Sequence, residues 1–363
     1  MKIGIDRKKV EYAVEHIKRE IELENLVKGE KMITPDQISK IFHISKMEAN
    51  VVLKRLRKEG AIVNLRKRGT FVSGITSEEI SRNTVGIILS DSASSSAQRV
   101  IRGIETVLSL NGFQIITKRS GNSQKKEEKL LKGLAGLNAA GYIIEPSRSQ
   151  LLCKHIELYK KLEKLGKPYV FIRSTYPQLR DKPHVVVDDS QGGYLLTRHM
   201  IATVGDNIVG IFRADDSRGS ERHRGYVMAL QEAGIPYRPE LVIWYHVEDG
   251  ATKPTLELEK ILNEQACDGI ICYNDAMATN IMYYLFDNGY NVPEDIAVAG
   301  YGNTAVATAG ELGLTTIAQP DELLGEMAAE CIVEMIRGEQ APGSKIEKVL
   351  NPELVIRGST VGT

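Results

Sequence analysis

The chain has 363 residues and carries 47 Lys and Arg against 47 Asp and Glu, so its formal net charge at pH 7 is zero. Hydrophobic residues make up 42% and charged residues 26%, which is ordinary for a globular protein of two or three domains. No apolar run approaches the roughly 20 residues that a membrane helix needs, and the first residues lack the apolar core of a signal peptide. The four cysteines show no paired spacing. The composition therefore predicts a cytoplasmic protein that does not enter a membrane.

The charges are divided unevenly along the chain. Residues 1–80 carry 17 Lys and Arg against 12 Asp and Glu, whereas the remainder carries 30 against 35. A basic small head and an acidic large body indicate two different partners. We expect a head domain over residues 1–74, a linker over 75–83 and a body over 84–363.

The head begins with two predicted helices. Apolar residues recur at helical spacing over residues 8–28, and again over the short segment 35–42. Thr34 can cap the second helix with its hydroxyl, and Pro35 suits the first helical position. A tight turn is predicted at residues 43–44.

A longer helix and a hairpin follow this turn. The helix is predicted over residues 46–59, starting after Ser45 and ending at Gly60, with Val52, Leu53 and Leu56 facing inward. The segments 61–65 and 70–72 are predicted to form two strands around a turn that contains glycine. In this order, the elements are typical of a winged helix-turn-helix domain.

Positive charge in this region favours DNA as the partner of the head. Residues 46–68 contain eight cations and two anions, and clustered cations of this kind bind a phosphate backbone. The alternative is a solvated helix face beside a basic loop. Asn50 on the exposed helix face can pair with two atoms of an adenine, and the hairpin tip can reach phosphates or the minor groove. The candidate DNA-binding residues are Thr34, Ser45, Lys46, Asn50, Lys54, Arg66, Lys67, Arg68 and Gly69.

The body alternates strands and helices, which predicts an α/β fold with parallel sheets covered on both faces. Because one sheet of this size would be large, we expect two lobes: 84–186 with 320–345, and 187–318 with 346–363. The predicted strands cover residues 85–89, 112–116, 140–144, 169–172, 185–187, 208–212, 269–273 and 296–300. The predicted helices cover residues 99–110, 125–138, 151–165, 192–204, 220–234, 254–265, 276–288 and 320–337.

Polar side chains follow many of the predicted strands. Ligands bind at the carboxyl ends of the strands in such sheets, so these side chains predict a binding cleft. Carboxylates and amides accept hydroxyl protons, guanidinium groups donate in a fixed plane and aromatic faces stack on sugars. The cleft therefore suits a neutral polyol. The candidates from this pattern are Ser90, Asp91, Glu145, Arg173, Tyr176, Asp216, Asn274, Asp275 and Asn303.

Beyond these patterns, both parts of the chain resemble known families. The segments Val52 to Leu56 and Arg68 to Val72 are similar to the winged helix of GntR-type regulators. Cys272 to Asp275, Val292 to Ile296 and Gln319-Pro320 are similar to the regulatory domain shared by LacI-type repressors and periplasmic sugar-binding proteins. The combination resembles the AraR group of arabinose-responsive repressors. It implies a two-lobed periplasmic-binding-protein-like body and a dimeric repressor that L-arabinose or a related sugar releases from its operator.

The resemblance also implies roles for single residues. Arg222 matches the arginine that contacts the effector in that family, although a helix-start ion pair with Asp215 or Asp216 is the alternative. Asn274 could instead cap the helix that follows it. Effector-binding positions are also implied for Arg173, Asn274-Asp275, Ser90-Asp91, Tyr245 and Gln319.

Several positions depart from the family patterns. Gly302 stands where an effector-binding aspartate is usual, and Asp36 and Asn50 stand where GntR-type heads usually hold arginines. The first departure keeps another pentose, a deoxyhexose, a phosphorylated sugar or a nucleoside open as the effector. The second keeps open the alternative of a cytoplasmic sugar-binding protein or a regulator with altered DNA binding. The chain shows no metalloprotease, phosphate-loop or nucleophile-elbow motif, so we expect no enzymatic activity, cofactor or metal.

Overall fold

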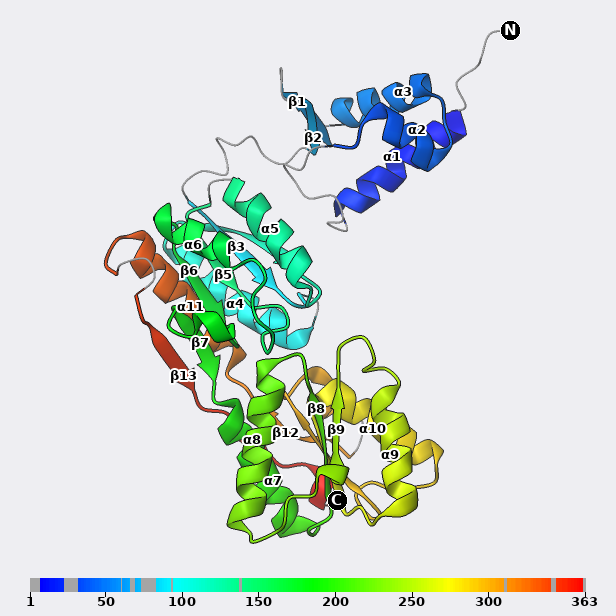
Figure 1. Cartoon of the computed structure of the whole chain (residues 1–363), viewed down its shortest axis with the longest axis vertical. Coiled ribbons are helices and arrows are strands. Elements are labelled where there is room, and N and C mark those ends of the chain that lie inside the picture. Colours follow the sequence, from blue (N-terminus) through cyan, green and yellow to red (C-terminus); the bar gives the residue numbers. More distant parts are fainter. Residues whose placement is uncertain are drawn as a thin grey trace. The chain divides into compact units, whose positions relative to one another are not determined.

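Figure 1 shows the computed structural model of the chain. The structure describes residues 7–22, 32–59, 61–65, 69–72, 83–92, 94–136, 139–309, 312–340 and 344–361. The chain divides into two compact units, one of residues 1–86 with 128–140, the other of residues 87–127 with 141–363.

The head contains three helices and a two-stranded antiparallel sheet, as the sequence predicts. Its core gathers apolar side chains of all three helices, including Val14, Ile38, Val52 and Leu56, each fully buried. Ile41 was expected on the same apolar face as Ile38 but is 57% exposed. The elements are α1 (Arg7–Glu22), α2 (Pro35–Phe42), α3 (Lys46–Lys58), β1 (Ile62–Leu65) and β2 (Gly69–Val72).

The ends of the head elements follow from local sequence. His43 adopts the left-handed conformation (φ 50°) and ends α2, so that Ser45 can start α3 at once. The predicted first helix extends to residue 28, and the part after residue 22 lies outside the described residues.

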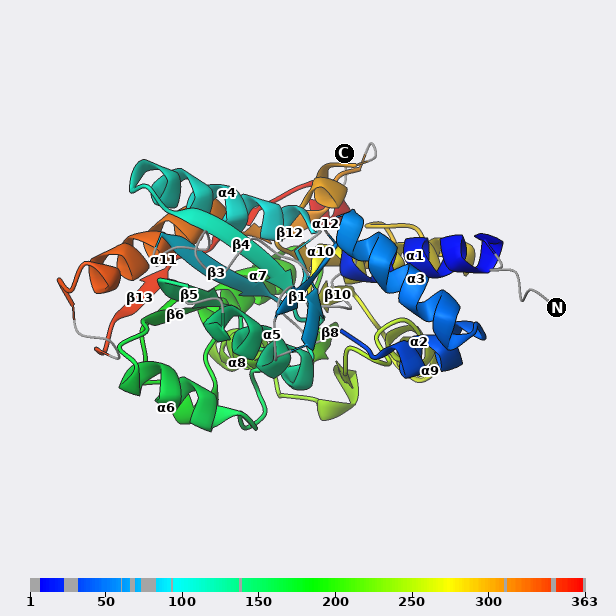
Figure 2. The same cartoon turned by 90° about the horizontal axis from the view of Figure 1, so that it is seen from above.

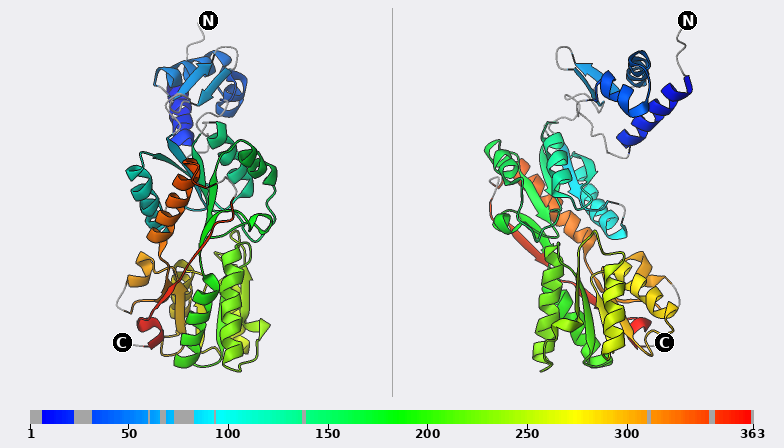
Figure 3. Two further views of the ribbon diagram at one scale, coloured as in Figure 1. Left: turned by 90° about the vertical axis from the view of Figure 1, so that its left-hand side faces the viewer. Right: turned by 45° about the vertical axis from the view of Figure 1, so that its right-hand side comes forward.

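The body has two six-stranded sheets, one in each lobe (Figure 3). The strand order is β13-β7-β6-β5-β3-β4 in the first sheet and β14-β12-β11-β10-β8-β9 in the second. The pairs with a recorded register are parallel except for β12 with β14. The strands are β3 (Thr84–Leu89), β4 (Gln114–Arg119), β5 (Gly141–Ile144), β6 (Tyr169–Ile172), β7 (His184–Val187), β8 (Ile208–Arg213), β9 (Val242–Tyr245), β10 (Gly269–Cys272), β11 (Ala297–Tyr301), β12 (Thr315–Ala318), β13 (Glu347–Leu350) and β14 (Glu353–Val355).

Helices pack closely on these sheets. In the first lobe α4 and α11 lie side by side (Figure 2) and contact strands of the sheet. In the second lobe one apolar core lies under α9 and α10 and another under α7 and α8. The helices are α4 (Ser95–Leu110), α5 (Gln124–Gly136), α6 (Ile156–Lys164), α7 (Asp189–Thr203), α8 (Ser217–Glu232), α9 (Lys253–Glu264), α10 (Asp275–Asp287), α11 (Asp321–Ile336) and α12 (Gly358–Val361), with 3-10 turns η1 (Pro177–Leu179), η2 (Pro239–Leu241) and η3 (Ala305–Thr308).

The chain passes between the two lobes three times. It leaves the first sheet after β7, returns after β12 and crosses again between β13 and β14. The prediction that residues 346–363 belong to the second lobe was therefore wrong for β13, which pairs with β7. The sequence patterns did not predict β9, β12, β13 and β14. β13 and β14 are three or four residues long and only partly buried, so they carry a weak pattern.

Candidate functional site

Two of the candidate DNA-binding residues cap helices of the head. Thr34 Oγ1 accepts a hydrogen bond from the amide of Gln37 at 3.3 Å, and Ser45 Oγ accepts one from the amide of Glu48 at 3.2 Å. The side chains of Gln37 and Glu48 in turn accept from the backbone N–H of the capping residues. Since losing such a cap costs about 1 kcal/mol, both hydroxyls have a structural role.

Lys46 and Asn50 lie on the exposed face of α3. The Lys46 ammonium is 2.7 Å from the Asp36 carboxylate, with side-chain exposures of 72% and 58%. Asn50 Nδ2 donates to the carbonyl of Lys46 at 2.9 Å. An ion pair this exposed contributes at most about 1 kcal/mol, so Lys46 can exchange Asp36 for another anion.

The cations of α3 fall into two groups. Arg55 donates to Glu59 at 3.0 Å and to Glu11 on α1 at 3.3 Å, so its charge is already paired. Lys54 is exposed and forms no ion pair within the described part of the chain. Gly69 is the first residue of β2 and lies opposite Leu65, whereas Arg66, Lys67 and Arg68 lie outside the described residues.

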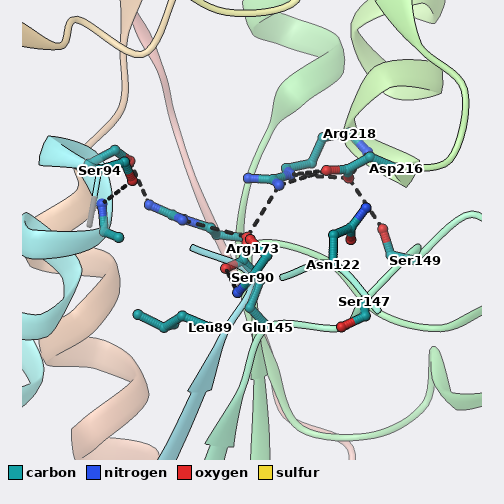
Figure 4. Close-up of polar contacts among 12 residues, drawn as sticks. Leu89, Ser90, Ser94, Asn122, Glu145, Ser147, Ser149, Arg173, Asp216 and Arg218 are labelled. Carbon is teal, nitrogen blue, oxygen red and sulfur yellow. Dashed lines mark hydrogen bonds and ion pairs between the residues drawn. The ribbon is translucent and has the colours of Figure 1, made fainter. Parts of the chain in front are cut away.

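Glu145 lies where the two lobes of the body meet (Figure 4), beside a cleft of about 370 Å³ that is lined by Arg173 of the first lobe and Arg218 of the second. It follows β5, is 1% exposed and accepts a hydrogen bond from the amide of Ser90 at 2.9 Å. Its carboxylate is 3.5 Å from Arg173 of the same lobe and 3.2 Å from Arg218 of the other lobe. Burial alone would raise the pKa of Glu145, but the two guanidinium groups hold it below its usual value.

Arg173 follows β6 and adopts a left-handed backbone conformation with φ of 65°. Non-glycine residues in this conformation store strain and are concentrated at functional sites. Its guanidinium donates to Asp321 at 3.2 Å and to Ser96 at 2.5 Å, while its buried Nε has no hydrogen-bond partner. A buried donor of this kind can bind a ligand acceptor.

A second group of contacts joins the lobes at the start of α8 (Figure 4). Asp216 accepts hydrogen bonds from Arg218 at 2.6 Å, from the Tyr273 hydroxyl at 2.8 Å and from Ser149 of the first lobe at 3.2 Å. Burial opposes ionisation of Asp216, but Arg218 and Arg213 lower its pKa far below the usual value. Asp216 therefore remains a carboxylate and holds Arg218 toward Glu145.

Arg222 lies one helical turn after Arg218 on α8. Its Nε donates to Asp189 at 2.7 Å, and its guanidinium is 3.6 Å from the centre of the Tyr301 ring and 4.7 Å from that of Tyr273. The alternative of an ion pair with Asp215 or Asp216 was wrong, because the partner is Asp189. Burial raises the pKa of Asp189 despite the nearby arginine.

Four other candidates are held inside their own lobes. Asn274 caps α10 by accepting from the amide of Met277 at 2.8 Å. Both oxygens of Asp275 accept hydrogen bonds from Thr304 and Thr316 of the same lobe. The Tyr176 hydroxyl donates to the buried carboxylate of Glu127, and Tyr245 packs on the ring of Tyr273. Tyr176, Tyr245 and Asp275 are each less than 5% exposed, and these contacts tie them to their own lobe.

The remaining candidates do not line the cleft. Asp91 is half-exposed and lies 3.4 Å from Arg119 on β4. Asn303 accepts from Arg357 at 2.8 Å, and Gln319 is partly buried in the segment that follows β12. The structure thus brings Ser90, Glu145, Arg173 and Asp216 together, and places Arg222 beside them on α8.

Sequence reasoning missed three residues that join the lobes. Arg218 pairs with Glu145, Asn122 donates to Asp215 at 3.2 Å and Arg99 donates to the Gly302 carbonyl at 2.9 Å. The spacing of four residues between Arg218 and Arg222 could have indicated a shared helix face. Asn122 follows β4 by three residues, but the predicted strand ended at residue 116, so the strand-end pattern did not reach it. Arg99 lies within α4, where this pattern gives no signal.

The cleft is suited to binding a polar ligand. It offers buried carboxylates and guanidinium groups at hydrogen-bonding distance from each other, which can exchange these partners for ligand hydroxyls. Within the described residues, no group of three or more His, Cys, Asp or Glu side chains could hold a metal ion, and no helix is long and apolar enough to cross a membrane.

The chain is similar to characterised transcriptional repressors. It is 33% identical over 336 residues to an arabinose metabolism transcriptional repressor of Geobacillus stearothermophilus, covering 91% of this chain and 92% of that protein. It is 30% identical over 341 residues to the repressor of the same name from Halalkalibacterium halodurans, covering 91% and 90%.

The fold of the body is also found in known domains and structures. A model of the periplasmic binding protein-like domain matches residues 197–360. The solved complex of the transcriptional regulator CelR with cellobiose superposes with a TM-score of 0.65 at 25% identity, covering 90% of this chain and 100% of that one.

Proposed function

The chain belongs to the family of the arabinose metabolism transcriptional repressors, and from this premise we propose that it represses carbohydrate-utilisation genes until a sugar binds. We propose L-arabinose or a related sugar as this inducer, because the named relatives act in arabinose metabolism. The observation that supports this most directly is the polar cleft, where Glu145 and Arg218 meet across the two lobes at 3.2 Å.

The effector would act by replacing contacts between the lobes. Hydroxyl groups can accept from Arg218 and Arg173 and donate to Glu145, while the Tyr301 and Tyr273 rings keep Arg222 in place. Exchanging the Glu145–Arg218 pair for contacts with a sugar changes the preferred angle between the lobes. A coupling free energy of about 1–3 kcal/mol would change operator affinity some 5–150-fold.

The head would bind double-stranded operator DNA through α3 and the β1–β2 hairpin in the manner of a GntR-type winged helix. Lys46, Asn50 and Lys54 lie on the exposed surface of α3 and are proposed contacts. Arg66, Lys67 and Arg68 are proposed to contact phosphates or the minor groove. Alanine at Lys67 and Arg68 would weaken binding to all DNA sequences and lower its salt dependence.

We further propose that the protein acts as a homodimer in the cytoplasm, where its DNA lies. Two heads on one two-fold axis read a roughly palindromic operator. On α10 of the body, Tyr283 and Phe286 are 68% and 77% exposed, and large apolar side chains so exposed are typical of protein interfaces. Since the relatives are transcriptional regulators, we propose no enzymatic activity.

Thermal unfolding of the purified chain with a panel of sugars tests the effector. A ligand that binds only the folded state at a hundredfold excess over its Kd stabilises that state by about 2.7 kcal/mol. A sugar that raises the unfolding temperature should also lower operator affinity in a fluorescence anisotropy assay. If that sugar binds and leaves operator affinity unchanged, the proposed induction is wrong.

A further inference from the structure

A second depression lies where the start of α4 faces the loop between β11 and β12. Its volume is about 530 Å³. Three arginines line it, Arg99, Arg102 and Arg357, together with neutral polar residues such as Ser95 and Asn303. Among the described residues no Asp or Glu lines it, so the depression is electropositive.

The three guanidinium groups are only partly neutralised. Arg99 donates to Asp321 at 2.7 Å, and Arg102 is 3.6 Å from the half-exposed Glu322. Arg357 donates to the carbonyl of Leu314 at 2.7 Å and to the Asn303 side chain at 2.8 Å. Within the described part of the chain no carboxylate pairs with Arg357, so its charge is uncompensated.

The backbone beside the depression helps to hold Arg99. Gly302 adopts φ of +126°, which side-chain-bearing residues rarely adopt. Its carbonyl accepts from Arg99 at 2.9 Å. Three arginines, and no Asp or Glu among the described lining residues, favour an anionic ligand group.

We propose that this depression binds the phosphate group of a small molecule, with Arg99, Arg102 and Arg357 as its donors. Planar guanidinium groups donate two parallel hydrogen bonds to phosphate oxygens, and the hydroxyl of Ser95 can add a third donor. The phosphate belongs either to a phosphorylated sugar whose ring occupies the cleft or to free phosphate. The first source rests on the proposed function of the cleft.

The depression is linked to the cleft by a chain of charged contacts. Asp321 accepts from Arg99 at 2.7 Å and from Arg173 at 3.2 Å, and Arg173 in turn lies 3.5 Å from Glu145. A phosphate competes with Asp321 and the Gly302 carbonyl for Arg99. Its binding therefore weakens a contact between the lobes and changes the surroundings of Arg173 in the cleft.

Thermal unfolding of the full chain at constant ionic strength tests the proposal. The probes are a neutral pentose, its 5-phosphate ester and inorganic phosphate, with sodium chloride to match the ionic strength. The variants are Arg102→Gln and, as a control, Arg198→Gln, because Arg198 is also exposed and lies over the Tyr194 ring on α7, outside both the depression and the cleft. We expect the phosphate ester to bind at least tenfold more tightly than the neutral sugar.

Arg102→Gln should weaken binding of the ester about tenfold while leaving binding of the neutral pentose unchanged, and Arg198→Gln should change neither. If inorganic phosphate alone binds and loses affinity in Arg102→Gln, the site takes free phosphate, which also supports the proposal. Equal affinity for pentose and ester, with no response to phosphate, overturns it and leaves the proposed function intact. If only phosphate-bearing ligands bind, and none changes operator affinity, the proposed function fails while the phosphate site stands.

Discussion

Glu145 shows how one buried carboxylate can be both structural and functional. It is 1% exposed, yet two guanidinium groups and an amide keep it ionised. Removing one partner of a buried ion pair leaves the other charged group uncompensated and destabilises a protein by about 3–5 kcal/mol. A neutral ligand that enters the cleft must therefore replace the partners it displaces, which selects for molecules rich in hydroxyl groups.

Glu145 should make stability depend on acid pH. Because its pKa is lower in the folded than in the unfolded state, it stabilises the fold above the unfolded pKa of about 4.3. This contribution is lost as the pH falls through the folded pKa. Urea unfolding from pH 6 to pH 3 should therefore show a smaller loss of stability for Glu145→Gln than for the wild type. If the free energy of unfolding falls equally with pH in both proteins, the carboxylate is not held ionised.

Two neighbouring cations of α3 should differ in their effect on DNA binding. Lys54→Ala should reduce the slope of log affinity against log salt by about 1, because it removes one proposed phosphate contact. Arg55→Ala is the matched control, since Arg55 already pairs with Glu59 and Glu11. Operator affinity measured over a range of chloride concentrations distinguishes the two. Equal slopes for both variants would contradict the proposed role of Lys54.

At the scale of elements, close packing of α7 against α8 positions Arg222. A Cβ at Gly225 would lie 2.0 Å from the carbonyl oxygen of Ser190, and one at Gly193 would lie 2.2 Å from that of Arg222. Both helices can therefore approach until their backbones touch. This contact fixes the distance between α7 and α8 and therefore the positions of Arg218 and Arg222 beside the cleft.

Gly225→Ala should separate these helices. Overpacking of this kind typically costs about 1–3 kcal/mol and would move Arg222 away from Tyr301. Gly136→Ala is the control, because among the described residues a Cβ built at Gly136 meets no atom within 4 Å beyond its chain neighbours and the backbone of its own helix. Gly225→Ala, but not the control, should lower both the free energy of unfolding measured in urea and the affinity for sugar. Unchanged sugar affinity would show that the cleft does not depend on this packing.

The separation along the chain between contacting residues explains which elements and site residues could be predicted from the sequence. The bounds of α2 and α3 followed from Thr34 and Ser45, because capping depends on residues a few positions apart. The strand-end rule located Glu145 and Arg173. It could not show that Tyr176 turns inward to Glu127 or that Arg222 pairs with Asp189, since these contacts join residues 33 or more positions apart.

At the scale of the molecule, a dimer would join the effector and DNA sites of two chains. Phe286→Lys on the exposed face of α10 should convert a dimer into a monomer, since it places a charge in the proposed apolar interface. Sedimentation at several concentrations measures the change. Lys260→Glu on α9, at an exposed ion pair, is a control that should leave the assembly intact. A dimer that persists in Phe286→Lys must use another surface.

The three passages of the chain between the lobes have a mechanical consequence. One covalent connection would let the lobes swivel in any direction, but three connections side by side leave bending about a single axis as the easy motion. They also make the body tolerant of damage, since a protease that cuts one connection leaves two. Nicked protein should therefore run as two fragments after denaturation, yet remain one particle under native conditions.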